Sequence, residues 1–421
     1  MSFRRISKYN QKSNINKKLG QFLIAFFSLF TLQNNAQTLQ EYITEAEQNN
    51  PQLKALQYTY EATVEKVKES GSLPNTTIGT GYFVSEPETR TGAQKAKFSA
   101  QQKMPWFGTL KARRDKELTQ SEVQKNEIEI ARRKIALKVK QRYYELYSLK
   151  AKELVLKEQK QLLENYKEVA ISEVAGNKAT TLDVLKITIA QNELDNKIEI
   201  LKGNILNVET SFNKLLDRDG FDELLVPDNL IIPEEEPTMS IDEVTYHPEL
   251  LKYDHLDEVV NAQKRVNDKE RLPGLSLGLD YVVVEERPNL NFDDNGKDIL
   301  MPMVSLSIPL FSKKYQSKDK QFDLMQEGYL QQRESEQNRL EEILEKAINN
   351  RITARINYNT QLKNVEQTKQ AEEVALTLYK TDQLKFDELI ELQNMILNFE
   401  IKKIEAITNY FVQTSFINYL N

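Results

Sequence analysis

The chain has 421 residues, with 57 basic and 63 acidic side chains, a formal net charge of −6, two histidines and no cysteine. The absence of cysteine excludes a disulfide framework and a thiol nucleophile, and two histidines leave little for zinc binding or acid–base catalysis. The acidic charge balance argues against a nucleic-acid partner. We therefore expect no enzyme, no metal site and no cofactor.

The amino terminus has the pattern of a secretion signal. Residues 1–21 contain six basic side chains and no acid, and the apolar run Phe22–Leu32 follows them. As a helix this run rises about 16 Å, roughly half of a bilayer core. With the small residue Ala36 as a cleavage point, we predict a signal peptide over 1–36 and export of the rest. An uncleaved membrane anchor is the alternative.

Proline positions separate helical from strand-like regions. All twelve prolines fall within 51–105 and 227–309. In the proline-free stretches apolar residues recur at helical spacing, for example at every fourth position from Leu340 to Ile356. This pattern predicts amphipathic helices with the narrow apolar seams of coiled coils. We expect two long helices, 109–172 and 313–380, and shorter helical segments at 38–72, 181–216, 240–271 and 386–420.

Each proline-rich window holds two segments that alternate as strands do. From Leu275 to Val283 the odd positions are apolar or aromatic, and three of the four even positions are Ser, Gly or Asp. Segments of this kind suit tilted outer-membrane strands of about 9 to 11 residues. We predict β-hairpins at 75–105 and 274–309, each with a polar connection. A soluble hairpin that caps a helical bundle is the alternative.

The sequence contains the same order of motifs twice. NPQLKAL at 50–56 corresponds to HPELLKY at 247–253, and SLPNTTIGTGYFV at 72–84 corresponds to RLPGLSLGLDYVV at 271–283. A repeat of this size indicates a duplicated half rather than a solenoid unit. We predict a first structural repeat at 37–216, a connecting segment at 217–239 and a second structural repeat at 240–421.

In each repeat the two short helical segments together are about as long as the one long helix. At 1.5 Å per residue the long helices measure on the order of 100 Å, so two short helices stacked end to end can run beside one long helix. One chain then supplies four rods and four strands. No apolar run after residue 37 is long enough for a spanning helix, so only a β-barrel could span a membrane. Four strands cannot close a barrel, since the smallest bacterial barrels have eight, so oligomerisation is required.

The repeated order of N/H-P-x-L, L-P, a hairpin ending in MPWFG or IPLFS, a long helix and a tip resembles the TolC outer-membrane efflux family. The resemblance implies a mainly α fold with a membrane β-barrel, a duplicated helix–hairpin–helix protomer, and a homotrimer with a 12-stranded barrel and a 12-helix periplasmic tube. It also implies an outer-membrane exit duct in a tripartite efflux system. The partners are then a periplasmic adaptor, an inner-membrane pump of the resistance-nodulation-division type and outer-membrane lipid. MPWFGTLKARRDK at 104–116 is similar to the heavy-metal subgroup.

Five residues are singled out with this resemblance. Its helix-tip turns correspond to Gly176 and Asp382, although the family commonly has Gly at the second position. Its pore constriction corresponds to Glu388 and Glu391, whose spacing of three places them on one helix face; a solvated helix face is the alternative. Trp106 suits the membrane interface or, alternatively, packing at the junction of barrel and helices. The competing function is a periplasmic coiled-coil scaffold without a channel.

Overall fold

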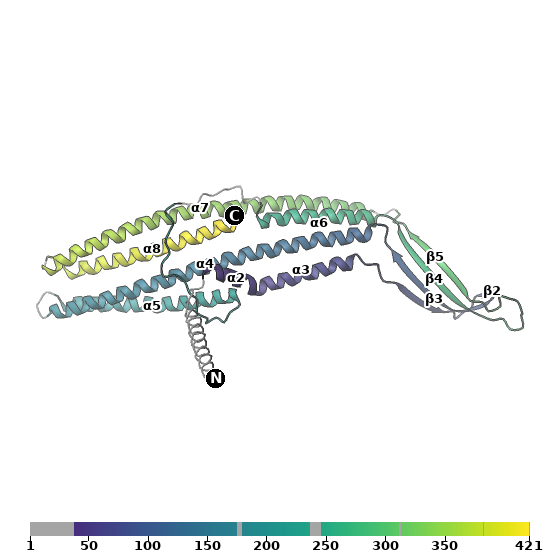
Figure 1. The fold of residues 1–421 in the computed structure, drawn as a ribbon, viewed down its shortest axis with the longest axis horizontal. Coiled ribbons are helices and arrows are strands. Elements are labelled where there is room, and N and C mark those ends of the chain that lie inside the picture. Colours follow the sequence, from purple (N-terminus) through teal and green to yellow (C-terminus); the bar gives the residue numbers. More distant parts are fainter. Residues whose placement is uncertain (1–37, 175–178, 236–245, 311–312, 382, 421) are drawn as a thin grey trace, which may run out of the picture.

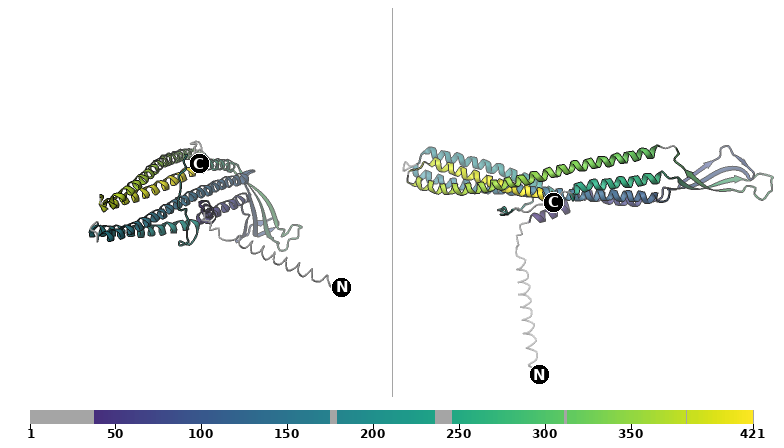
Figure 2. Two further views of the ribbon diagram at one scale, coloured as in Figure 1. Left: turned by 60° about the vertical axis from the view of Figure 1, so that its left-hand side comes forward. Right: turned by 90° about the horizontal axis from the view of Figure 1, so that it is seen from above.

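The computed structural model describes residues 38–174, 179–235, 246–310, 313–381 and 383–420. The molecule is long and narrow, with the helices along most of its length and a β-sheet at one end (Figure 1). The chain is mostly helical, as predicted. The ribbon seen from two further directions forms a single curved layer rather than a bundle closed around a core (Figure 2).

The first half of the chain contains two short helices, the strands β1 to β3, one long helix and its returning partner. Their bounds are α2 Leu39–Asn49, α3 Pro51–Ser70, β1 Thr77–Tyr82, β2 Glu88–Thr89, β3 Gly92–Met104, α4 Thr109–Val174 and α5 Thr181–Leu216. The second half follows the same order with α6 Pro248–Glu270, β4 Gly274–Glu285, β5 Ile299–Ser307, α7 Lys314–Lys380 and α8 Phe386–Leu420. No helix within the described ranges combines the length and the hydropathy needed to cross a bilayer.

The helices lie side by side in one order along the whole molecule. Beside the sheet the order is α3, α4, α6, α7, and in the far half α5 and α8 continue the positions of α3 and α6 (Figure 1). The long helices α4 and α7 therefore run unbroken beside pairs of shorter helices. Two short helices stacked against one long helix is the arrangement that the segment lengths predicted.

The four longer strands form one antiparallel sheet in the order β1-β3-β4-β5, and β2 pairs only with β3. Successive rows of paired residues across the sheet alternate between mainly apolar and mainly polar or small side chains. The row Thr80, Phe98, Tyr281, Leu300 is mainly apolar, and the next row, Gly79, Ser99, Asp280, Met301, is mainly polar or small. Since neighbouring residues of a strand point to opposite faces, the sheet has one apolar and one polar face.

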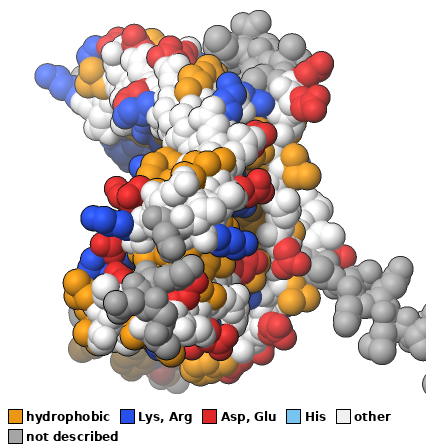
Figure 3. Space-filling model, turned by 90° about the vertical axis from the view of Figure 1, so that its left-hand side faces the viewer, with side chains coloured by type: hydrophobic (Ala, Val, Ile, Leu, Met, Phe, Trp, Pro, Cys, Tyr) orange, Lys and Arg blue, Asp and Glu red, His pale blue; other side chains and the backbone are white. Residues whose placement is uncertain are grey.

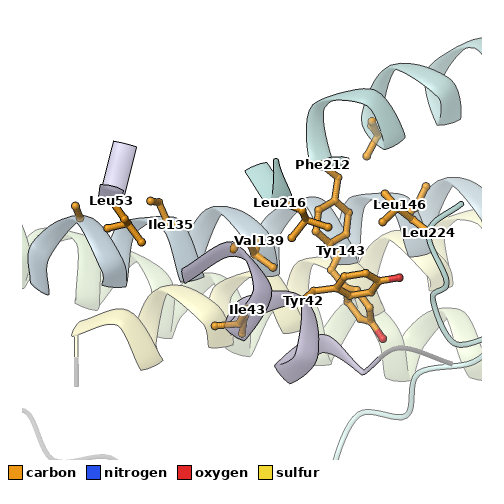
Figure 4. Close-up of a cluster of buried hydrophobic side chains, with 13 residues drawn as sticks. Tyr42, Ile43, Leu53, Ile135, Val139, Tyr143, Leu146, Phe212, Leu216 and Leu224 are labelled. Atoms are coloured by element: carbon orange, nitrogen blue, oxygen red, sulfur yellow. The ribbon is translucent and has the colours of Figure 1, made fainter. Parts of the chain in front are cut away.

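A hydrophobic cluster in the middle of the molecule joins the short helices to α4 (Figure 4). Tyr42 of α2 packs against Phe212 of α5 with ring centroids 5.1 Å apart. The Tyr42 hydroxyl also accepts a 2.9 Å hydrogen bond from the Leu225 amide. Leu146 of α4 is fully buried in this cluster. The cluster therefore fixes α2, α5 and the connecting segment on the middle of α4.

The predicted helical segment 38–72 is wrong in one respect, because it is two helices that meet at Asn50. Pro51 occupies the first position of α3, where its missing amide hydrogen is not needed. The Asn50 side chain accepts a 2.9 Å hydrogen bond from the Gln52 amide and so caps the new helix. The chain therefore changes from one helix to the next at Asn50, and we call such a break between two short helices a joint.

Candidate functional site

The apolar face of the sheet is exposed to solvent in the single chain. Ile78 is 82% exposed and Val304 is 73% exposed. Further exposed apolar or aromatic side chains of the same face are Tyr82, Phe98, Leu277, Leu279, Tyr281, Leu300 and Leu306. An apolar surface of this extent, carried by every long strand, is a surface for lipid or for another protein.

The opposite face of the sheet carries small and polar side chains together with one buried charge. Asp280 is fully buried and pairs with Lys97 of the neighbouring strand. Thr77, Gln101 and Ser276 share this polar face. The two faces thus differ in the way that a barrel wall between lipid and water requires.

Both lateral edges of the curved layer are open. Within the described ranges, the strands β1 and β5 each pair on one side only. The helices at these same edges are α3 and α5 on one side and α7 on the other. Exposed apolar side chains recur at helical spacing on both edge helices, at Leu182, Leu185 and Ile189 of α5 and at Ile352, Ile356 and Val374 of α7. These edges have the features of surfaces that another chain covers.

At the end far from the sheet, the α4–α5 pair and the α7–α8 pair are linked by several contacts. Lys186 of α5 forms an ion pair with Asp387 of α8 at 2.7 Å. The Tyr379 hydroxyl of α7 donates a 2.8 Å hydrogen bond to Glu173 of α4. Phe386 is buried between Tyr166 and Tyr379, with ring centroids 6.1 and 5.6 Å away. We call these residues the tip contacts.

A partly buried hydroxyl also connects α4 to α7 at this end of the molecule. Tyr166 of α4 donates a 2.8 Å hydrogen bond to Glu372 of α7. Burial, aided by this hydrogen bond to a carboxylate, raises the pKa of Tyr166 above its ordinary value. The hydroxyl therefore stays protonated and remains a donor at any physiological pH.

Seen from the helical end, acidic and basic side chains are interspersed with hydrophobic patches (Figure 3).

The predicted constriction residues lie next to the tip contacts. Glu388 and Glu391 are exposed, and they occupy the beginning of α8 one turn apart. In the described part of the chain neither carboxylate has a hydrogen bond or ion pair from another side chain. The predicted turn residues Gly176 and Asp382 lie outside the described residues. The structure thus places the two glutamates at the tip as solvated acids and leaves their role as a proposal.

The second half of the chain has a joint equivalent to the one at Asn50. His247 precedes Pro248 at the start of α6, and its Nδ1 accepts a 3.3 Å hydrogen bond from the Glu249 amide. Its Nε2 lies 3.1 Å from the carbonyl oxygen of Tyr419 near the end of α8. In the first half, Asn50 caps α3 and donates a 3.0 Å hydrogen bond to the Leu215 carbonyl near the end of α5. In each half one side chain therefore connects the end of one short helix to the start of another. Asn50 connects α5 to α3, and His247 connects α8 to α6.

A buried carboxylate stabilises the second joint. Glu249 pairs with Lys134 of α4 and with Arg339 of α7, and it accepts a 3.0 Å hydrogen bond from the Tyr419 hydroxyl. Burial alone raises the pKa of Glu249, but hydrogen bonds within this cluster and the charge of Lys134 lower it to about 2. The carboxylate therefore remains ionised, and it ties three helices to the joint. Burial also lowers the pKa of His247, so the imidazole is neutral at neutral pH.

Trp106 lies where the sheet meets the helices. It is 37% exposed, and its ring makes an edge contact with Phe107, which is 84% exposed. Trp106 also lines a cleft between the base of the sheet and the helix ends. The residue thus sits at the level of the junction, with part of its ring in the cleft, and its role at a membrane interface stays a prediction.

The joints and the tip contacts were not predicted from the sequence. The Asn-Pro and His-Pro dipeptides occupy corresponding positions in the two halves, and each also has the pattern of a helix start. The tip contacts join helices far apart in sequence, so no local pattern identifies them. Lys186 and Asp387, for example, are separated by 201 residues.

No protein-family model matches the sequence, and no curated protein matches it. Solved structures do match over nearly the whole chain. The outer membrane protein VceC from Vibrio cholerae has 14% identity and a TM-score of 0.71, covering 91% of this chain and 95% of its own. The Campylobacter jejuni CmeC outer membrane channel has 14% identity and a TM-score of 0.72, covering 91% and 85%. The Neisseria gonorrhoeae MtrE outer membrane channel, in its open state, has 13% identity and a TM-score of 0.72, covering 91% and 88%. The chain therefore has the fold of the TolC-type outer-membrane channels, as its repeated motifs predicted.

Proposed function

We propose that the chain is the outer-membrane channel subunit of a tripartite efflux system and serves as a passive exit duct. The observation that carries this proposal is the open curved layer, whose strand edges and helix edges lie on the same two sides of the molecule. Identical copies placed edge to edge continue the sheet and the helical layer together. Such a closed ring has no unpaired strand edge, which lipid requires.

Three copies suit a duct better than two. Two copies would supply eight long strands, and the interior of an eight-stranded barrel is filled by its own side chains. Three copies supply twelve long strands and leave an open lumen. The apolar face of the sheet then contacts lipid, and the polar face with Lys97 and Asp280 lines the passage. The helices continue this passage as a twelve-helix tube in the periplasm.

Glu388 and Glu391 narrow the tube at its periplasmic end in this proposal. Threefold symmetry repeats their exposed carboxylates around one axis and produces acidic rings. Rings of carboxylates attract cations and select for them. The partners are a periplasmic adaptor and an inner-membrane pump of the resistance-nodulation-division type. The pump chooses the solute, and metal cations and drugs are both candidates.

The test is to purify the mature chain from membranes and measure its mass and its conductance. We expect extraction by detergent but not by salt or alkali, a trimer mass by native mass spectrometry, and discrete conductance steps in planar bilayers. The scaffold alternative predicts extraction without detergent and no conductance. Its difficulty is the exposed apolar face of the sheet, since a soluble scaffold would have to cover that face. A monomer without conductance would reject the proposal.

A further inference from the structure

A cleft of about 680 Å³ lies at the base of the sheet. It is lined by the ends of β3 and β5, the start of β4, the last turn of α6 and the first turns of α4 and α7. We call it the basal cleft. The side chains that matter for its chemistry are Lys103, Thr109, Arg113, Lys269, Glu270 and Lys314. Each of the crossings from helix to sheet or back contributes to its wall.

The basal cleft has an excess of positive charge. Among the described residues that line it, four side chains are basic and one, Glu270, is acidic. Arg113 already pairs with Glu270 at 2.9 Å, and Lys318 lies 3.7 Å from the other oxygen of the same carboxylate. Lys103 and Lys269 have no carboxylate within ion-pair distance in the part of the chain that the structure describes. Two ammonium groups therefore remain uncompensated in one cleft.

Thr109 adds a polar atom that lacks a partner. This residue is only 3% exposed, and its hydroxyl oxygen has no hydrogen-bond partner among the described residues. A buried hydroxyl without a partner destabilises the protein, and an acceptor from a ligand would remove that penalty. Thr109 is also the first residue of α4, where the helix dipole adds partial positive charge.

The arrangement of Lys269 keeps its charge near Thr109. Its aliphatic carbons lie against Gly108, 3.5 Å from the position of an ideal Cβ there. Gly108 has a φ of +83°, a conformation that favours glycine, and it directly precedes Thr109. The turn at Gly108 thus presents the start of α4 next to the Lys269 stem.

We propose that the basal cleft binds a phosphate group of a small ligand. The Thr109 hydroxyl and the ammonium groups of Lys103 and Lys269 donate hydrogen bonds to its oxygens, and Trp106 forms an apolar wall. Hydrogen bonds from charged donors to phosphate are short and strong, which suits a site with two uncompensated lysines. This inference goes beyond the exit duct, because the site is formed within one chain.

The probe for this site is inorganic pyrophosphate, titrated calorimetrically into the full mature protein in lipid-free detergent. We expect saturable binding that weakens about tenfold in Lys103→Met and in Lys269→Met, the loss typical of one charged hydrogen bond. Thr109→Val preserves the side-chain shape and should weaken binding severalfold. The control is Lys54→Met on α3, an exposed lysine outside the cleft, which should leave binding unchanged. The absence of saturable binding, or equal losses in Lys54→Met, would overturn the proposal.

A competition experiment identifies the source of the phosphate. Displacement of pyrophosphate by dihexanoyl phosphatidylglycerol, but not by glycerol phosphate, assigns the cleft to a lipid headgroup. Displacement by glycerol phosphate alone assigns it to a soluble phosphorylated solute. If neither compound displaces pyrophosphate, a phosphate ester is not the ligand and the proposal fails.

Discussion

His247 and Asn50 perform the same two tasks in the two halves of the chain. Each accepts a hydrogen bond from an amide at the start of one helix and contacts a carbonyl at the end of another, Tyr419 for His247 and Leu215 for Asn50. The Asn50 carboxamide does not become protonated as pH falls, whereas the His247 imidazole can take up a proton and become positively charged. We therefore expect the second joint to be sensitive to pH and the first to be insensitive.

The first prediction concerns this difference. Burial lowers the folded-state pKa of His247, so the unfolded chain binds a proton first as pH falls below the ordinary value near 6.5. The contribution of His247 to the free energy of unfolding should therefore be constant at higher pH and decrease as pH falls below about 6.5. His247→Asn, which copies the first joint, should make stability less dependent on pH in that window. Thermal unfolding at pH 7.5 and 5.5 measures this, with His255→Asn as the control. An unchanged pH dependence in His247→Asn would contradict it.

The second prediction concerns Glu388 and Glu391. Hexaamminecobalt(III) added on the periplasmic side of a planar bilayer should block conductance, because confined carboxylates attract multivalent cations. The double variant Glu388→Gln, Glu391→Gln should lose the block and keep its oligomeric state. The control variant replaces Glu345 and Glu366 of α7 by Gln, two exposed acids away from the tip. If the first double variant keeps the block, these glutamates are ordinary surface residues.

The third prediction concerns whether the tip contacts restrain the end of the proposed tube. Lys186 and Asp387 are 44% and 54% exposed, so their ion pair contributes about 0 to 1 kcal/mol. Lys186→Glu should raise the open fraction of single channels by up to about fivefold, and the added change Asp387→Lys should reverse the effect. Lys202→Glu, which breaks only the pair with Glu199 inside α5, is the control. Equal conductance in all variants would mean that this pair does not restrain the tip.

The fourth prediction concerns orientation in the membrane. The sequence has no cysteine, so single introduced cysteines report without background. Ser85 and Asn291 are exposed in the two connections at the far end of the sheet, and their Cys variants should react with an impermeant maleimide on whole cells. Ser172→Cys near the helical tip should react only after the outer membrane is opened. Labelling of Ser172→Cys on intact cells would invert the proposed topology.

The fifth prediction concerns stability. Leu146 is fully buried in the central cluster, and Leu146→Ala should reduce the free energy of unfolding by about 2 to 5 kcal/mol through a cavity. Leu154→Ala lies on the same helix but replaces an exposed side chain, so it should reduce the free energy of unfolding much less. Chemical denaturation followed by circular dichroism measures both. Similar losses in the two variants would show that the cluster does not hold the joint together.

The sequence predicts the helices well wherever local signals are strong. The segments 181–216 and 386–420 coincide with α5 and α8. Thr180 and Asp183 form a capping box at the start of α5, which is a signal within four residues of the chain. Strand alternation likewise predicts the apolar face of β4. These features depend on residues close together in sequence.

The rest depends on distant residues or on other copies of the chain. The apolar pattern continues across the break at Asn50, and contacts with distant residues, such as the packing of Tyr42 on Phe212, set the position of α2. The basal cleft gathers side chains from the two halves, for example Thr109 and Lys269. The role of Glu388 and Glu391 depends on neighbours that one chain does not contain. The Asn-Pro dipeptide is a local signal for the helix start at Asn50, but no local pattern identifies the basal cleft or the neighbours of the two glutamates.

The two joints also mark the place along the molecule where we expect it to bend. The long helices α4 and α7 continue past the joints without interruption, whereas the shorter helices beside them begin or end there. The 36 residues of α5 give a lever of about 54 Å from the joint to the tip. A rotation of about ten degrees at the joint moves the tip by about 9 Å, the width of a helix, while the sheet stays in place. We therefore expect a small rotation at mid-length to produce a large displacement at the end far from the sheet, where we propose that the partners bind.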